Sequence, residues 1–142
     1  MSGSNYPLKI AQIKADLFVA KATIEEARKR TPSAGKYLKG QAGYHLQQAA
    51  EKLIKIQIYY SVPQPDLRKM YKHSLNELIK YAQSLGVNVI IPKYILDKRL
   101  LITSWEADGR YDVHMTVKIT QLEKAFLEIE AWCDDLSKNG YK

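Results

Sequence analysis

The sequence has few of the features that mark secreted and membrane proteins. It contains a single cysteine, Cys133, so no disulfide can form within the chain, which is typical of a reducing compartment. No apolar run approaches the roughly 20 residues that a helix needs to cross a bilayer. The opening residues, MSGSNYPLK, lack the apolar segment of a signal peptide. We therefore expect a cytoplasmic protein with no membrane segment.

The common metal and phosphate motifs are missing as well. The three histidines and the cysteine do not have the spacing of metal ligands. The seven glycines form neither of the common phosphate-binding loops. We expect no metal site and no cofactor.

Composition and charge describe an ordinary globular domain with a basic first half. The chain has 142 residues, of which 46% are hydrophobic and 26% charged, so we expect residues 1–142 to form one domain. The first 71 residues hold twelve Lys or Arg and five Asp or Glu, so this half carries the whole net charge of +7. The excess, which includes the cluster Arg28-Lys29-Arg30, fits either a polyanionic partner or a solvated helical surface.

The most regular apolar stretch is Gln41–Tyr60. Its apolar residues recur every three or four positions, as on one stripe of a helix: Ala42, Leu46, Ala49, Leu53, Ile56 and Tyr60. Glu51, Lys52 and Lys55 fall outside this stripe and are expected to stay in water. A helix this apolar needs neighbours on more than one side, because burial supplies most helical stability.

The same periodicity predicts four further helices. They run from Leu8 to about Lys29, from about Leu67 to just before Gly86, from Pro92 to about Glu106, and from a cap at Thr116 to near Leu136. The β-like run Val87–Ile91 has no second run to pair with, so we expect a buried connector. Five helices with short connections predict an all-α, up-and-down five-helix bundle.

Three stretches, in this order, resemble the HEPN family (higher eukaryotes and prokaryotes nucleotide-binding). QQAAEKLIK at 47–55 is similar to the QAAEKxLK-type second helix of that family, and HSLNEL at 73–78 to its H-x-L-x-x-L third helix. WEADGRYD at 105–112 resembles the element that ends in R-Y-P-D, although no proline follows Tyr111. The resemblance implies a HEPN-like helical bundle.

The resemblance also implies a role connected with nucleotides or nucleic acid. It implies a binding module for a nucleotide or RNA, or the partner of a small nucleotidyltransferase in a toxin–antitoxin type system. Other family members are metal-independent RNases with an R-x4-6-H pair in a cleft across a dimer. A homodimer is expected here, both from the resemblance and from the Ala-rich and Tyr-rich helix faces, such as Ala49-Ala50 and Tyr59-Tyr60.

Two Arg/His pairs come close to the RNase pattern. RNA cleavage without a metal needs a group that moves protons and a cation that stabilises the charged phosphorane. Arg110 and His114 lie in the predicted loop before the last helix, one residue short of the pattern. Arg68 and His73 have the right spacing but lie on a predicted helix, where five residues correspond to about 140° of rotation. His73 also fits a structural role, in which it hydrogen-bonds a neighbouring loop.

The loop around Arg110 is the candidate ligand site. The Arg110 guanidinium suits a phosphate, the Tyr111 ring suits a stacked base, and Asp112 completes the set. In the alternative interpretation Tyr111 fixes the loop to the bundle and Arg110 pairs with Asp108 or Asp112. A third interpretation is an interaction bundle with no ligand.

Overall fold

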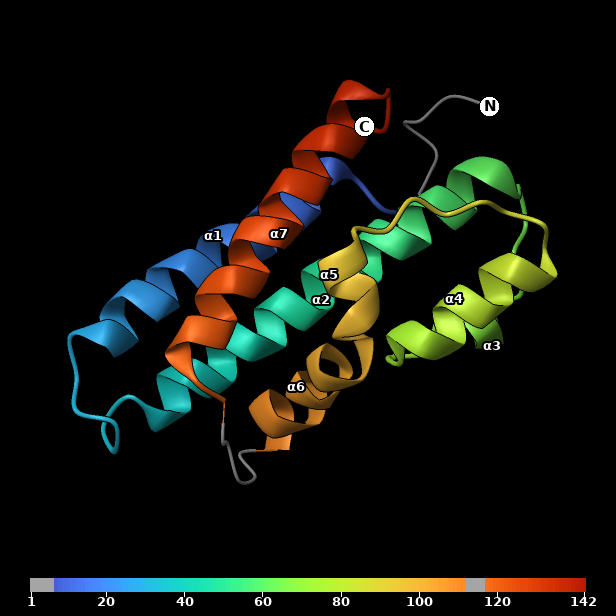
Figure 1. Cartoon of the computed structure of the whole chain (residues 1–142). Helices are drawn as coiled ribbons and strands as arrows, with labels where there is room; N and C mark the ends of the chain where they lie inside the picture. Colours follow the sequence, from blue (N-terminus) through green and yellow to red (C-terminus); the bar gives the residue numbers. More distant parts are fainter. Residues whose placement is uncertain (1–6, 112–116) are drawn as a thin grey trace.

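The computed structural model describes residues 7–111 and 117–142, and of residues 107–111 the backbone. The described residues form seven helices and no strand (Figure 1): α1 Ile10–Arg28, α2 Lys36–Ser61, α3 Leu67–Met70, α4 Leu75–Ser84, α5 Lys93–Asp97, α6 Arg99–Tyr111 and α7 Ile119–Lys138. The predicted all-α class is confirmed, whereas the predicted number of five helices is wrong.

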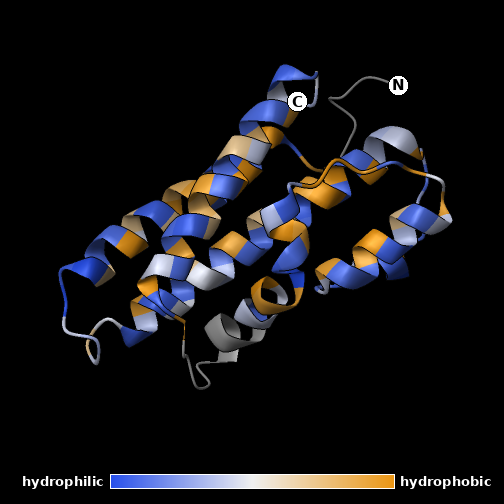
Figure 2. Cartoon of the chain, in the orientation of Figure 1, coloured by the Kyte–Doolittle hydropathy of each residue, from blue (hydrophilic) through white to orange (hydrophobic). Residues whose placement is uncertain are grey.

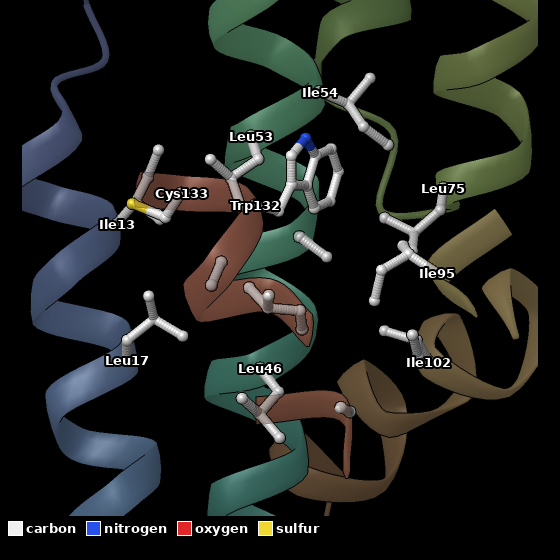
Figure 3. Close-up of a cluster of buried hydrophobic side chains, with 14 of the residues drawn as sticks. Ile13, Leu17, Leu46, Leu53, Ile54, Leu75, Ile95, Ile102, Trp132 and Cys133 are labelled. Carbon is white, nitrogen blue, oxygen red and sulfur yellow. The ribbon is translucent and has the colours of Figure 1, made fainter. Parts of the chain in front are cut away.

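Helix α2 lies at the centre of the bundle, as its apolar stripe predicts. It contacts α1 and α7 on one side and α4 and α6 on the other (Figure 1). Its own core side chains meet those of five other helices (Figure 3): Ile13, Leu17, Leu46, Leu53, Ile54, Leu75, Ile95, Ile102, Trp132 and Cys133. Ala49 and Ala50 are completely buried in this core. They therefore cannot contribute to the Ala-rich dimer face that the sequence suggested.

Helices α1 and α7 lie side by side along one face of α2. Hydrophobic and hydrophilic residues are interleaved along both helices (Figure 2), and each helix buries one stripe against the core. The observed α1 begins two residues after the predicted start and ends one residue before the predicted end. The N-cap of α7 is Lys118, and the predicted cap, Thr116, lies outside the described residues.

The predicted third helix is broken into α3 and α4. Helix α3 ends at Met70, and α4 begins after Ser74, whose side chain accepts a hydrogen bond from the backbone N–H of Glu77. Ser74 and Glu77 have the S-x-x-E spacing of a helix start. This local signal prevails over the apolar periodicity that continues across the break, so His73 lies in a connection and not on a helix.

The predicted fourth helix is also broken, and it extends further than expected. Helix α5 ends at Asp97, and Lys98 separates it from α6, which continues to Tyr111. Asp108-Gly109, a dipeptide typical of turns, therefore does not end α6. A glycine inside a helix costs only about 1 kcal/mol relative to alanine. Arg110 and Tyr111 belong to the helix and not to the predicted loop.

A glutamine holds the extended connector 87–91 in place. The Gln57 amide oxygen accepts from the Ile90 backbone N–H at 2.8 Å, and its NH₂ group donates to the Ile90 carbonyl at 3.0 Å. The Trp132 indole donates to that same carbonyl at 2.8 Å. The backbone of the connector thus pairs with side chains in place of a second strand. The connector is only partly buried, with Ile90 49% exposed.

Candidate functional site

A buried polar network links α2 to the connection between α3 and α4. Glu51 is 3% exposed, although its position in the sequence predicted a solvated side chain. Its carboxylate accepts from Lys55 Nζ at 2.7 Å, from Gln47 Nε2 at 3.1 Å and from His73 Nδ1 at 3.1 Å. Gln47 Nε2 also donates to the His73 carbonyl at 2.7 Å. A carboxylate with these partners can be buried, because each of its oxygens accepts a hydrogen bond.

A second carboxylate joins α1 to α2 in the same manner. Asp16 is 9% exposed, and it accepts from His45 Nδ1 at 2.9 Å and from Lys52 Nζ at 2.7 Å. Each buried acid of α1 and α2 is thus shared by one histidine and one lysine. None of the hollows described below is lined by these residues, and the geometry is that of a polar joint between helices.

The alternative pair Arg68 and His73 does not share one element. Arg68 lies on α3, its side chain is 94% exposed, and its Nε is 3.7 Å from Asp66 Oδ1. His73 lies in the connection after α3, and its ring hydrogen-bonds Glu51 of α2. Each residue is therefore associated with a carboxylate of its own. His73 fits the structural interpretation, with its own loop tied to α2.

The leading pair and the ligand set fall at the edge of the described residues. Arg110 and Tyr111 form the last turn of α6, and Asp112 and His114 lie outside the described residues. The C-terminal end of α6 lies at the same end of the bundle as the starts of α2 and α7 (Figure 1).

That end of the bundle is strongly basic. We define the basic end by six residues around the end of α1 and the starts of α2 and α7: Arg28, Lys29, Arg30, Lys36, Lys39 and Lys118. Arg28 pairs with Glu123, and Arg30 Nη2 is 2.8 Å from Glu26. The Arg30 guanidinium hydrogen-bonds the Glu26 carboxylate and lowers the pKa of Glu26. The four lysines form no salt bridge with a described side chain of residues 7–106 and 117–142, so the end keeps a positive excess.

A hollow of about 180 Å³ opens at the basic end, between the α1–α2 turn and the start of α7. Arg28, Arg30, Lys39 and Ile119 are among the residues that line it. The N-cap of α2 is Gly35, which has no side chain to accept from the first backbone N–H groups of that helix. Cationic side chains and the N-terminus of a helix both favour an anion. This arrangement is suited to a phosphate group or to the backbone of a nucleic acid.

The described residues contain no cluster of three or more His, Cys, Asp or Glu that would hold a metal ion. Among the same residues, no helix combines the length and the hydrophobicity that a membrane span needs. The chain matches no family model, no curated protein and no solved structure in the three comparisons.

Sequence reasoning missed two parts of this arrangement. Lys39 lies before Gln41–Tyr60, the stretch that the apolar period predicts as the central helix, whereas α2 begins at Lys36 and carries Lys39 into the hollow. Glu51 was assigned to solvent. The polar series Gln47, Glu51 and Lys55 repeats every four residues and marks one face of the helix, but the same pattern is typical of a solvated face.

Proposed function

We propose that this chain is a HEPN-like binding module whose basic end holds a nucleotide or a segment of RNA. The observation that carries the proposal is the hollow of the basic end, which Arg28, Arg30 and Lys39 line together with Gly35, the N-cap of α2. Guanidinium and ammonium groups recognise phosphate oxygens, the first as a planar fork and the second as a point charge. The HEPN resemblance supports the same class of ligand.

The position of the segment that begins with Arg110 adds a second line of support. Its helix, α6, ends at the same end of the bundle (Figure 1). Under this proposal Arg110 contacts phosphate and Tyr111 stacks on a base, while the lysines of the basic end add sequence-independent attraction. A small nucleotidyltransferase as the partner chain belongs to the same proposal.

Binding of labelled single-stranded RNA and of labelled ATP, measured by fluorescence anisotropy, tests the proposal. Lys39→Glu should weaken binding of at least one probe about tenfold or more, and binding should fall steeply with salt because phosphate contacts release counterions. Arg110→Ala should also weaken binding. The fold should survive Lys39→Glu, since a carboxylate near the start of a helix interacts favourably with the helix dipole.

Lys80→Glu is the matched control, because it makes the same charge change on an exposed residue of α4. An equal loss in Lys80→Glu and Lys39→Glu, or no binding of either probe by the wild type, would contradict the proposal. Cleavage of the RNA in the presence of a chelator, abolished by both Arg110→Ala and His114→Ala in folded protein, would favour the RNase alternative instead.

A further inference from the structure

We infer that the groove between α1 and α7 is the interface through which two copies of this chain associate. The α1–α7 groove is the surface channel bordered by Lys14, Phe18 and Lys21 of α1 and by Leu127, Glu130 and Asp134 of α7. It does not include Lys39, and the inference stands independently of the proposed ligand.

Apolar side chains are exposed on both edges of the groove. Phe18 is 75% exposed and Leu127 is 60% exposed, although each lies on a helix with a well-buried inner stripe. Between them lie two adjoining hollows of about 220 and 270 Å³, which share Lys21 and Phe126. A phenyl ring that is left in water beside an apolar channel favours a partner that covers it.

Charges of opposite sign line the two edges. Helix α1 contributes a basic row at intervals of seven residues, Lys14, Lys21 and Arg28, and α7 contributes an acidic row, Glu123, Glu130 and Asp134. Glu25 is the one acidic residue of α1 among those that line the two hollows. One edge of the groove is thus basic and the other acidic, so the surface can bind a second copy of itself through opposite charges.

The two rows run in register within one chain. Arg28, at the end of α1, pairs with Glu123, near the start of α7. Lys14, near the start of α1, lines the same hollow as Asp134, near the end of α7. The helices are therefore antiparallel, and oppositely charged residues stand at the same level along the groove.

This register selects one symmetry for the dimer. A two-fold axis parallel to the groove places α1 of each copy over α7 of the other and leaves every level unchanged. The basic row then faces the acidic row of the second copy, and the two Phe18 rings lie at one level on either side of the axis. An axis across the groove would instead place α1 on α1 and bring like charges together.

A crosslinking experiment tests the geometry. Phe18→Cys should be linked into a dimer by a bismaleimide with a spacer of roughly 13 Å, because the two copies of residue 18 lie at one level on helices that are diagonal to each other across the axis, about 13 Å apart for helices packed 8–10 Å from their neighbours. Leu100→Cys on α6 is the matched control, since Leu100 is 68% exposed and lies away from the groove. The native Cys133 is completely buried and should not crosslink. Equal rates for the two variants, or no dimer from Phe18→Cys, would overturn the inference.

Charge reversal tests the symmetry. Sedimentation equilibrium of the wild type should show a reversible monomer–dimer equilibrium. Lys21→Glu and Glu130→Lys should each weaken it about tenfold, because two contacts per dimer turn from attraction to repulsion. An equimolar mixture of the two variants should regain the affinity of the wild type, and Lys80→Glu should leave it unchanged.

Two results of the sedimentation series would refute this arrangement. A wild type that stays monomeric at high concentration while the mixture dimerises would indicate the axis across the groove. A wild-type dimer that neither single variant weakens would place the interface on another face.

Discussion

Glu51→Gln removes one charge from the interior of the bundle and almost no volume. The glutamine oxygen can still accept from Gln47 and His73, which both donate to Glu51 Oε1 at 3.1 Å. Its NH₂ group would face Lys55 Nζ, which donates to Glu51 Oε2 at 2.7 Å. Two hydrogen-bond donors, the new NH₂ group and Lys55 Nζ, then face each other in place of the charge-assisted hydrogen bond. Because the Lys55 side chain is only 12% exposed, water cannot fully replace the lost acceptor.

We expect the free energy of unfolding to fall by about 2–3 kcal/mol, the usual range for losing a buried hydrogen bond to a charged group. Urea titrations followed by circular dichroism at 222 nm measure this change, provided that the slope of the transition stays constant. Glu51→Gln combined with Lys55→Met should be more stable than Glu51→Gln alone, because no cation is then left in the interior without its partner.

Asp97→Asn is the control, because it tests whether the loss of stability comes from the burial of the ion pair or from its short contact distance. Lys93 Nζ lies 2.8 Å from Asp97 Oδ2, almost the same distance as in the Glu51–Lys55 pair, but both side chains are exposed. No measurable change in stability is expected there. A Glu51→Gln variant within about 0.5 kcal/mol of the wild type would refute the reasoning. An equally large loss in Asp97→Asn would do the same.

Three further predictions concern the core. Gln57→Leu should lower the free energy of unfolding by about 1–2 kcal/mol in the same titration, because the backbone N–H of Ile90 loses its acceptor; unchanged stability would mean that water replaces the amide. Leu53→Asp should give no cooperative unfolding transition, since residue 53 is completely buried and an unpaired charge there is too costly; a native-like transition would show that the core is misplaced. Burial raises the pKa of the Cys133 thiol to about 11, so stability gained from the neutral thiol is present below pH 9 and is lost as the pH rises toward 11. Native protein should react slowly with a thiol reagent at pH 8 and urea-unfolded protein quickly; equal rates would contradict this.

The central helix could be predicted from the sequence because its environment is simple. Neighbours cover α2 on two sides, so nearly every apolar position in Gln41–Tyr60 is buried and the 3.6-residue period is complete. The breaks at Tyr71–Ser74 and at Lys98 could not be predicted from this period, because the apolar spacing continues through both. At the first break the deciding interaction is local, a Ser74 cap that the sequence does contain.

The burial of charged residues was beyond reach for a different reason. Whether Glu51 is buried or solvated depends on His73, which is 22 positions away and reaches α2 only because α4 folds back beside that helix. Asp16 depends in the same way on His45, 29 positions away. A pattern within one helix contains no information on such partners, and it assigns a charged residue to solvent by default. Most charges of the basic end, by contrast, lie close together in the sequence, between residues 28 and 39. The excess of positive charge there can therefore be predicted from the sequence.

The hydrogen bonds of Glu51 give a structural role to residues of the stretches that resemble the HEPN family. Gln47, Glu51 and His73 are polar residues of two of the stretches that resemble the family, and in this structure they hydrogen-bond to one another where α2 meets the connection between α3 and α4. Any helical bundle that fixes a loop to its central helix in this way needs such residues, whether or not it binds a ligand. These residues therefore have a structural use in this bundle that does not depend on a ligand. Evidence for a ligand has to come from residues that the fold does not already use, which are the lysines of the basic end and the segment that begins at Arg110.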